Sequence, residues 1–354
     1  MFSPKRRLVW GLSTFALLAS TPALGSGTIT GLDVLRTWNL VVLGDLSSSS
    51  EVEGKTFVGG NLNGNSSNYQ ISSSVANSTG TPGLTVVGDV NGGAKNLNNG
   101  SGAIVGGNVN SGFNLNGSAQ TVQVGGTISN TNVNQNTVQS GLGASNPQFT
   151  QDLQQQKSQI DTSMGSLSHD LSQLASNSAL SISGNKGTFD AQPDANGVAV
   201  FNISAADLDK IGEIAFNLNG ADTAIVNVTG SSISLNDNFL GGTQNLGEHV
   251  IWNFPDATSL DLTNAWGGSV LAPNAAATTS NYIQGSAVFG SLTQNGEMHV
   301  GTYSGGYDPA GPGSSSSSTS SGGSTPVPEP GVVLLFGLGV ATLIWRARRL
   351  ATAR

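Results

Sequence analysis

A five-residue unit decides the fold of this chain: Val58-Gly59-Gly60-Asn61-Leu62, Val86-Val87-Gly88-Asp89-Val90, Val105-Gly106-Gly107-Asn108-Val109 and Val124-Gly125-Gly126-Thr127-Ile128. An earlier copy is Val42-Leu43-Gly44-Asp45-Leu46. From Gly44, the steps between successive central glycines are 16, 28, 19 and 19 residues. Repeats of this length are typical of single coils of a solenoid, which bury an apolar face only against neighbouring coils. We ascribe the 28-residue step to an outward loop around 65–82.

Stacking these units predicts two apolar columns inside the solenoid. Successive side chains of a strand alternate between faces, so the first and fifth positions of the unit share a face with the glycine. The predicted core columns are Val42, Val58, Val86, Val105 and Val124, and beside them Leu46, Leu62, Val90, Val109 and Ile128. A third, polar column consists of Asp45, Asn61, Asp89, Asn108 and Thr127. Its polar side chains suit turn chemistry and side-chain hydrogen-bond ladders, with a calcium or ligand strip as the alternative.

One segment has a helical period instead. Asn146-Pro147 supplies a cap residue followed by proline at the first helical position. Apolar residues then recur every three, four or seven positions from Phe149 to Leu174. This pattern predicts one long α-helix at about 147–176, packed by a single stripe along the side of the solenoid.

Strand patterns return after about Ala179, so the C-terminal half is predicted to continue or complete the same solenoid. Ile225-Val226-Asn227-Val228 and Ile251-Trp252-Asn253-Phe254 alternate, which is typical of strands. Val288-Phe289-Gly290-Ser291-Leu292 restores the five-residue unit, and Trp266-Gly267-Gly268-Ser269-Val270 is a near match.

Both ends of the chain carry export-type signals. Lys5, Arg6 and Arg7 precede an apolar run, which closes at the small residues around Ala23, Leu24 and Gly25. This order predicts a signal peptide over residues 1–25, cleaved after Gly25. A Ser/Gly/Pro linker over 305–326 precedes a second apolar run, 331–345, which would span about 22 Å as a transmembrane helix.

The C-terminal segment resembles the PEP-CTERM sorting signal of Gram-negative bacteria. The residues that carry this resemblance are Val327, Pro328, Glu329 and Pro330, the apolar run, and Arg346, Arg348 and Arg349, within 327–349. The arginines favour a cytoplasmic C-terminus, which leaves the body of the chain outside. The resemblance implies processing by an exosortase as well as by signal peptidase. It also implies an inner-membrane intermediate, followed by transfer to the cell surface or the extracellular matrix.

Composition agrees with an exported body. The chain has no cysteine, 10% charged residues and a net charge of −8. Neither disulfides nor thiolate metal sites can form. Nucleic acid is excluded as a partner because its phosphates require clustered Lys and Arg.

The body over residues 26–304 resembles the choice-of-anchor A family, an ice-binding-like adhesive domain. The segments that carry the match are Trp38 to Asp45, the Val-Gly-Gly-Asn steps, Gly268 to Ala275, Ile283-Gln284-Gly285 and Gly296 to His299. The resemblance implies a right-handed parallel β-solenoid (β-helix) flanked by one long helix, in an all-β class. It also implies attachment to a surface, or a structural role in the exopolysaccharide matrix. Separately, we expect no cofactor.

Catalytic chemistry is sparse in the sequence. The three histidines are His169, His249 and His299, and neither Glu248-His249 nor Glu297-x-His299 has a second histidine nearby, so no metal site is expected. Gly267-Gly268-Ser269-Val270-Leu271 lacks the closing glycine of a hydrolase elbow.

A polysaccharide lyase or glycosidase would need convergent carboxylates, for which Asp45 with Asp89, or Asp256 with Asp261, are the candidates. Ice or crystal-surface binding is the other alternative, although threonine pairs such as Thr278-Thr279 are only scattered. We predict a non-catalytic adhesive or structural protein.

Overall fold

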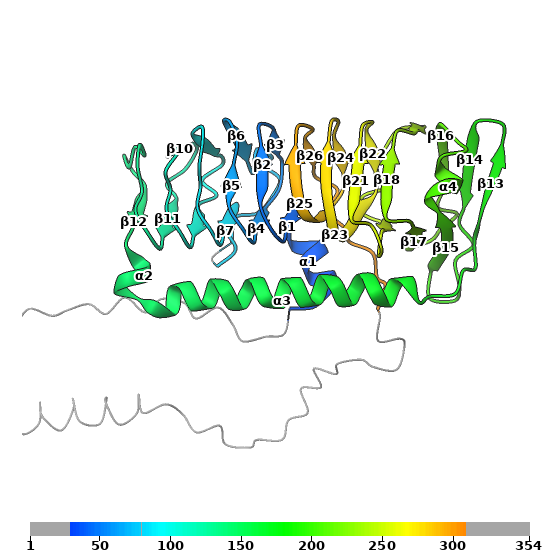
Figure 1. The fold of residues 1–354 in the computed structure, drawn as a ribbon, viewed down its shortest axis with the longest axis horizontal. Helices are drawn as coiled ribbons and strands as arrows, with labels where there is room; N and C mark the ends of the chain where they lie inside the picture. Colours follow the sequence, from blue (N-terminus) through cyan, green and yellow to red (C-terminus); the bar gives the residue numbers. More distant parts are fainter. Residues whose placement is uncertain (1–28, 79, 309–354) are drawn as a thin grey trace, which may run out of the picture. The chain divides into compact units, whose positions relative to one another are not determined.

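The computed structural model describes residues 29–308, except residue 79. The described chain is mostly β-structure with parallel sheets and few helices (Figure 1), an arrangement consistent with a β-solenoid. Every pairing between the named strands is parallel, except the pairing of β13 with β14. We call this array of coils the stack, and its three long sides the helix face, the polar face and the third face.

The largest sheet supplies two sides of the stack. Along the helix face, in spatial order, lie β12 (Thr137–Gln139), β11 (Thr121–Val124), β9 (Ala103–Val105), β7 (Leu84–Val86), β4 (Thr56–Val58), β1 (Leu40–Val42), β25 (Ala287–Gln294), β23 (Ser269–Thr279), β20 (Val250–Asn253), β17 (Thr223–Thr229) and β15 (Val198–Ser204). The polar face is formed by β5 (Leu62–Asn63), β2 (Leu46–Ser48), the second halves of β25 and β23, β21 (Ser259–Leu262) and β18 (Ser232–Leu235). A register shift between Ala272 and Ala276 marks where β23 passes from one face to the other.

Two smaller sheets form the third face. One contains, in spatial order, β10 (Phe113–Leu115), β8 (Lys95–Leu97), β6 (Ser67–Tyr69), β3 (Glu51–Val52), β26 (Met298–His299), β24 (Ile283–Gln284) and β22 (Trp266–Gly267). The other contains β13 (Ala179–Ser183), β14 (Lys186–Asp190), β16 (Glu213–Asn217) and β19 (Asn238–Leu240).

The two apolar columns lie inside the stack. The register aligns Val42 with Val58, then Val86, Val105 and Val124, and all five are fully buried. Leu46, Leu62, Val90, Val109 and Ile128 align in the same way on the polar face, and only Ile128, in the last coil, is partly exposed. Aligned valines and leucines bury their side chains against the coils above and below, which no single coil can do alone.

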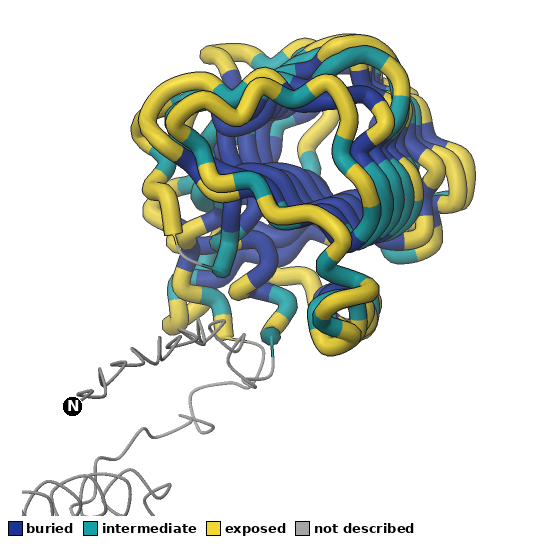
Figure 2. The backbone as a smooth tube through the Cα atoms, turned by 90° about the vertical axis from the view of Figure 1, so that its left-hand side faces the viewer, coloured by how far each residue is buried: buried dark blue, intermediate teal, exposed yellow. Residues whose placement is uncertain are grey.

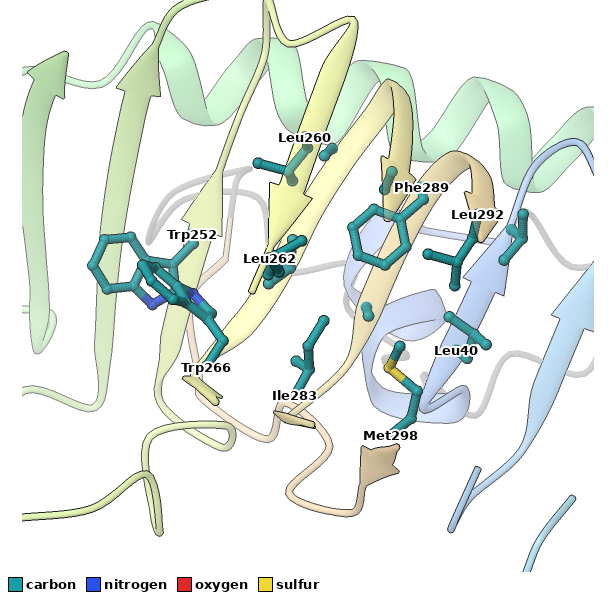
Figure 3. Close-up of a cluster of buried hydrophobic side chains, with 14 of the residues drawn as sticks. Leu40, Trp252, Leu260, Leu262, Trp266, Ile283, Phe289, Leu292 and Met298 are labelled. Carbon is teal, nitrogen blue, oxygen red and sulfur yellow. The ribbon is translucent and has the colours of Figure 1, made fainter. Parts of the chain in front are cut away.

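The order of the coils differs from a simple solenoid, because the chain starts in the middle of the stack. From β1 the coils proceed outward to β12, the helix α3 (Pro147–Ser172) runs back along the stack, and the remaining coils return from β15 to β25 (Figure 1). Leu40 of β1 pairs with Ala287 of β25, and Figure 3 shows Leu40 among Phe289, Leu292 and Met298 of the C-terminal part. The C-terminal half therefore completes the stack by joining its middle.

The predicted long helix is present as α3, and it gives the stack a second core. Its buried residues are Leu153, Ile160, Met164, Leu167, Ser168 and Leu171. They and α1 (Gly31–Thr37) pack on outward side chains of the helix face such as Phe57, Ile225 and Leu271. Seen end-on, the buried residues line the walls of the coils and the contact with the helices (Figure 2). The short helices α2 (Leu142–Ser145) and α4 (Ala205–Leu208) lie at opposite ends of the stack.

Three local expectations were wrong. The segment 65–82 is not wholly an outward loop, because Ser67–Tyr69 forms β6 and pairs with β3 and β8. Phe289, not Val288, occupies the interior column beside Val42, and Val288 faces the helices. Trp266 belongs to the third face, so Trp266 to Val270 is a corner rather than a coil unit.

The predicted signal peptide, the linker from 309 onward and the sorting signal with its transmembrane helix 331–345 lie outside the described residues. Within residues 29–308, no helix is both long enough and apolar enough to cross a membrane.

Candidate functional site

The polar column forms a ladder of side-chain hydrogen bonds from coil to coil. Asp45 Oδ1 accepts from the Asn61 N–H at 2.7 Å, and Asn61 Oδ1 accepts from the Asp89 N–H at 2.9 Å. Asp89 Oδ1 then accepts from the Asn108 N–H at 2.6 Å, and Asn108 Oδ1 from the Thr127 N–H at 2.9 Å. Each short polar side chain therefore satisfies a backbone donor in the next coil, which fixes the coil spacing.

The ladder explains the glycine of the five-residue unit. A β-carbon at Gly88 would lie 2.5 Å from Asn61 Oδ1, and one at Gly107 would overlap Asp89 Oδ1. The glycine N–H also donates to the glycine of the preceding coil, from Gly107 to the Gly88 carbonyl at 3.0 Å. Glycine is required because the ladder oxygen of one coil occupies the space that a side chain would fill in the next.

Two outward columns run the length of the polar face. The register and the coil-to-coil hydrogen bonds align Ser232, Ser259, Ala276, Ser291, Asp45, Asn61, Asp89, Asn108 and Thr127 in one column, and Ser234, Asp261, Thr278, Thr293, Ser47, Asn63, Asn91 and Asn110 in the other. Neighbouring members are about 4.8 Å apart because they sit on adjacent strands, and the two columns are about 7 Å apart along the strands. The face is thus a regular grid of small side chains, most of which carry hydroxyl or amide groups.

The second column is held by amide ladders. Asn91 Nδ2 donates to Asn63 Oδ1 at 3.0 Å, and Asn110 Nδ2 donates to Asn91 Oδ1 at 2.8 Å. The acidic members of the two columns are Asp45, Asp89 and Asp261, and no member is basic. Ordered side chains of this kind lose little conformational freedom when a ligand binds.

A further asparagine ladder attaches α3 to the helix face, and the sequence reasoning missed it. Asn227 Nδ2 donates to the Leu171 carbonyl at 2.7 Å, and Asn253 Nδ2 to the Ser168 carbonyl at 2.8 Å. Asn202 Nδ2 donates to the Leu174 carbonyl at 2.9 Å. The only sequence signal was an asparagine at the same place in three aligned strands.

Among residues 29–308, no group of three His, Cys, Asp or Glu side chains is placed so that it could hold a metal ion. His299 Nε2 lies 2.9 Å from Glu297 Oε2, and its ring stacks on Tyr282 at 4.4 Å. His249 Nδ1 bonds the Asp222 carbonyl at 2.8 Å, and His169 is exposed on α3.

Ser269 has a structural role. Its buried hydroxyl donates to the Gly247 carbonyl at 2.9 Å and accepts from the Ser286 N–H at 3.0 Å. These two bonds occupy the hydroxyl in holding neighbouring coils together.

Lys95 and Asp237 are ionisable groups buried in the stack. Burial lowers the pKa of Lys95 to about 8, while its ammonium donates to the Gly64 and Asn65 carbonyls at 3.0 and 2.6 Å. Burial raises the pKa of Asp237 to about 6, helped by the charge of Asp209. Neither side chain is exposed on the polar face, because both are buried.

The comparison with known protein families gives two matches. The profile of the ice-binding-like adhesive domain matches residues 31–300, which contain all the strands β1 to β26. The PEP-CTERM protein-sorting motif matches residues 326–349. No curated protein and no solved structure matches the chain.

Proposed function

The chain belongs to the ice-binding-like adhesive domain family, and from this premise we propose that it is a non-catalytic adhesive or structural protein of the cell surface or extracellular matrix. The PEP-CTERM motif implies an exported protein that passes through the membrane on its way to the surface, and it implies processing by an exosortase. In this proposal, signal peptidase removes residues 1–25, the apolar run 331–345 holds an inner-membrane intermediate, and the exosortase acts near Pro328-Glu329-Pro330. The ligand is an exopolysaccharide, and the stack is a right-handed parallel β-solenoid.

The observation that carries the proposal is the polar face. Its grid of hydroxyl and amide groups offers hydrogen-bond donors and acceptors at strand spacing over the whole stack, which suits a long polyhydroxylated chain. Its three acids and lack of bases favour a neutral polysaccharide over a polyanion. The non-catalytic part of the proposal is supported by the ladders, which engage Asp45 and Asp89 in separate coils with Asn61 between them.

Two asparagines offer a matched test. Asn110 on the polar face and Asn114 on the third face are both exposed, and each donates to the asparagine of the preceding coil, at 2.8 and 2.7 Å. We expect Asn110→Arg to weaken retention of the protein on immobilised exopolysaccharide from the producing bacterium. Asn114→Arg should bind like the wild type, because its side chain lies on another face.

If the two variants lose retention on the exopolysaccharide equally, the polar face is not the binding surface. Release of oligosaccharide from the polymer would instead support the lyase or glycosidase alternative. Thermal hysteresis without polysaccharide retention would support ice binding.

A further inference from the structure

The end of the stack formed by β12 has an open strand edge. β12 is the outermost strand of the largest sheet and pairs only with β11 (Figure 1). None of its three residues is buried. Val138 continues the interior alignment of Val122, and it is half-exposed because no further coil covers it.

The register shows which backbone groups this edge offers. Val138 aligns, coil by coil, with Thr56 and Leu40, whose N–H groups donate to the following coil at 3.0 and 3.2 Å. Thr137, by contrast, donates back to the Gln120 carbonyl at 2.9 Å. Backbone groups of successive strand residues point to opposite sides, so the Val138 N–H and C=O point out of the open end.

The last coils before this edge contain no charged residue. Residues 96–151 contain no Asp, Glu, Lys, Arg or His, and they include the last coils, the start of α3 and Val133, which is 45% exposed. Soluble proteins ordinarily protect an exposed edge with lysine, other charges or proline. Here only the shortness of β12 restrains pairing with another strand.

The opposite end is built differently. Asn177 covers the edge of β15, because its side chain donates to the Val198 carbonyl at 2.9 Å and accepts from the Val200 N–H at 2.7 Å. The antiparallel strand β13 closes the neighbouring sheet, and Lys186 at its turn adds charge. Of the two ends within the described residues, the β12 end alone combines an open edge with an uncharged surface.

We propose that two copies of this chain join end to end through β12, in a symmetric antiparallel pairing centred on Val138. The outward N–H and C=O of one Val138 then bond those of the other, and each Thr137 lies opposite a Gln139 of the second copy. We assign a second copy of the chain as the partner because β12 can pair with itself in this arrangement. Its residues are uncharged, so the two copies do not repel each other at this edge. The result is a continuous double-length stack with both capped ends outward, in closed two-fold symmetry.

The absence of cysteine from the chain gives a direct test on the purified full-length protein. In a hydrogen-bonded antiparallel pair the two α-carbons are about 5.5 Å apart, within disulfide range. Under mild oxidation, Val138→Cys should give a covalent dimer on a non-reducing gel. Ile182→Cys in β13, at the capped end and 40% exposed, should stay monomeric.

A charge pair tests the register independently. The double variant Thr137→Lys with Gln139→Lys sets like charges opposite each other twice, and should raise the dimer dissociation constant about ten-fold in sedimentation experiments. Thr137→Lys with Gln139→Glu sets opposite charges across the same pairs and should restore association. A wild type that sediments as a monomer at all concentrations, or dimers that respond equally to both double variants, would overturn the proposal. Covalent ladders that form only when Val138→Cys and Ile182→Cys are combined in one chain would also overturn it, because they would indicate head-to-tail fibres instead.

Discussion

The ladder makes a strong prediction for Gly107→Ala. The new β-carbon would overlap Asp89 Oδ1 and lie 2.8 Å from the Gly88 carbonyl oxygen. It should therefore displace the 2.6 Å bond from the Asn108 N–H to the Asp89 carboxylate and stretch the 3.0 Å bond from Gly107 to Gly88. A bond to a charged acceptor contributes about 2 kcal/mol and a neutral one about 1 kcal/mol, so the free energy of unfolding should fall by about 3 kcal/mol.

Calorimetry of the Gly107→Ala protein should show a melting temperature about 6 to 10 °C below that of the wild type. Gly165→Ala is the matched control, because a β-carbon there meets nothing within 4 Å and alanine favours the helix α3. Its melting temperature should be unchanged or slightly higher.

The Asp89→Ala background isolates the ladder from the backbone contact. There, the overlapping oxygen is already absent, so Gly107→Ala should cost only about 1 kcal/mol more. Two results would contradict this explanation of the repeat. Gly107→Ala could have the melting temperature of the wild type, or it could lower the free energy of unfolding equally in the wild-type and Asp89→Ala backgrounds. Either result would show that the ladder does not require the glycines.

Three other predictions follow from buried groups. Asn253→Ala should lower the free energy of unfolding by about 3 kcal/mol and speed amide exchange near Ser168, because this asparagine bonds the helix backbone, the Ser168 hydroxyl and Asn227; Asn274→Ala, which removes an exposed side chain, should do neither. Because the folded pKa of Lys95 is about 8, below its ordinary value, the unfolded chain binds more protons between pH 8 and 10.5, and stability should rise with pH there; chemical denaturation of Lys95→Met should lose this rise. Because the folded pKa of Asp237 is raised to about 6, the folded chain binds more protons between pH 4 and 6, and stability should rise as pH falls through that window; Asp237→Asn should remove the effect and raise the melting temperature at pH 7.

The coil interior could be predicted from the sequence because its signal is local and repeated. The five-residue unit shows which residues belong to each column. Parallel strands in the same register then align Val58 with Val86 without further information. The helix was predictable for the same reason, since its stripe repeats every three or four residues. The end of the helix was harder to predict than its course. The pattern extends to about residue 176, but α3 ends at Ser172 because the chain turns at Asn177 to pair with Val200.

The order of the coils could not be predicted, because no local pattern distinguishes one parallel neighbour from another. Leu40 and Ala287 are paired although they lie at opposite ends of the described sequence. Any coil with buried apolar residues could stack against β1. The pairing of β1 with β25 therefore depends on α3, which carries the chain back along the whole stack. The ladder of Asn202, Asn227 and Asn253 was hidden likewise, since polar residues on a strand suggest a solvated face until a helix is known to cover it.

The central position of both ends of the described chain bears on how an adhesive stack carries load. Arg36 of α1 donates to the Gly305 carbonyl at 2.6 Å and lies 5.7 Å from the Tyr303 ring, while the Tyr303 hydroxyl bonds Thr223 at 2.8 Å. A pull on the chain beyond residue 308 therefore acts first on this contact and then on the middle of the stack. In a solenoid whose chain leaves from a terminal coil, the same pull would peel that coil away with few bonds broken at a time. Here the terminal coils are built from internal residues, so the same pull does not act on them directly.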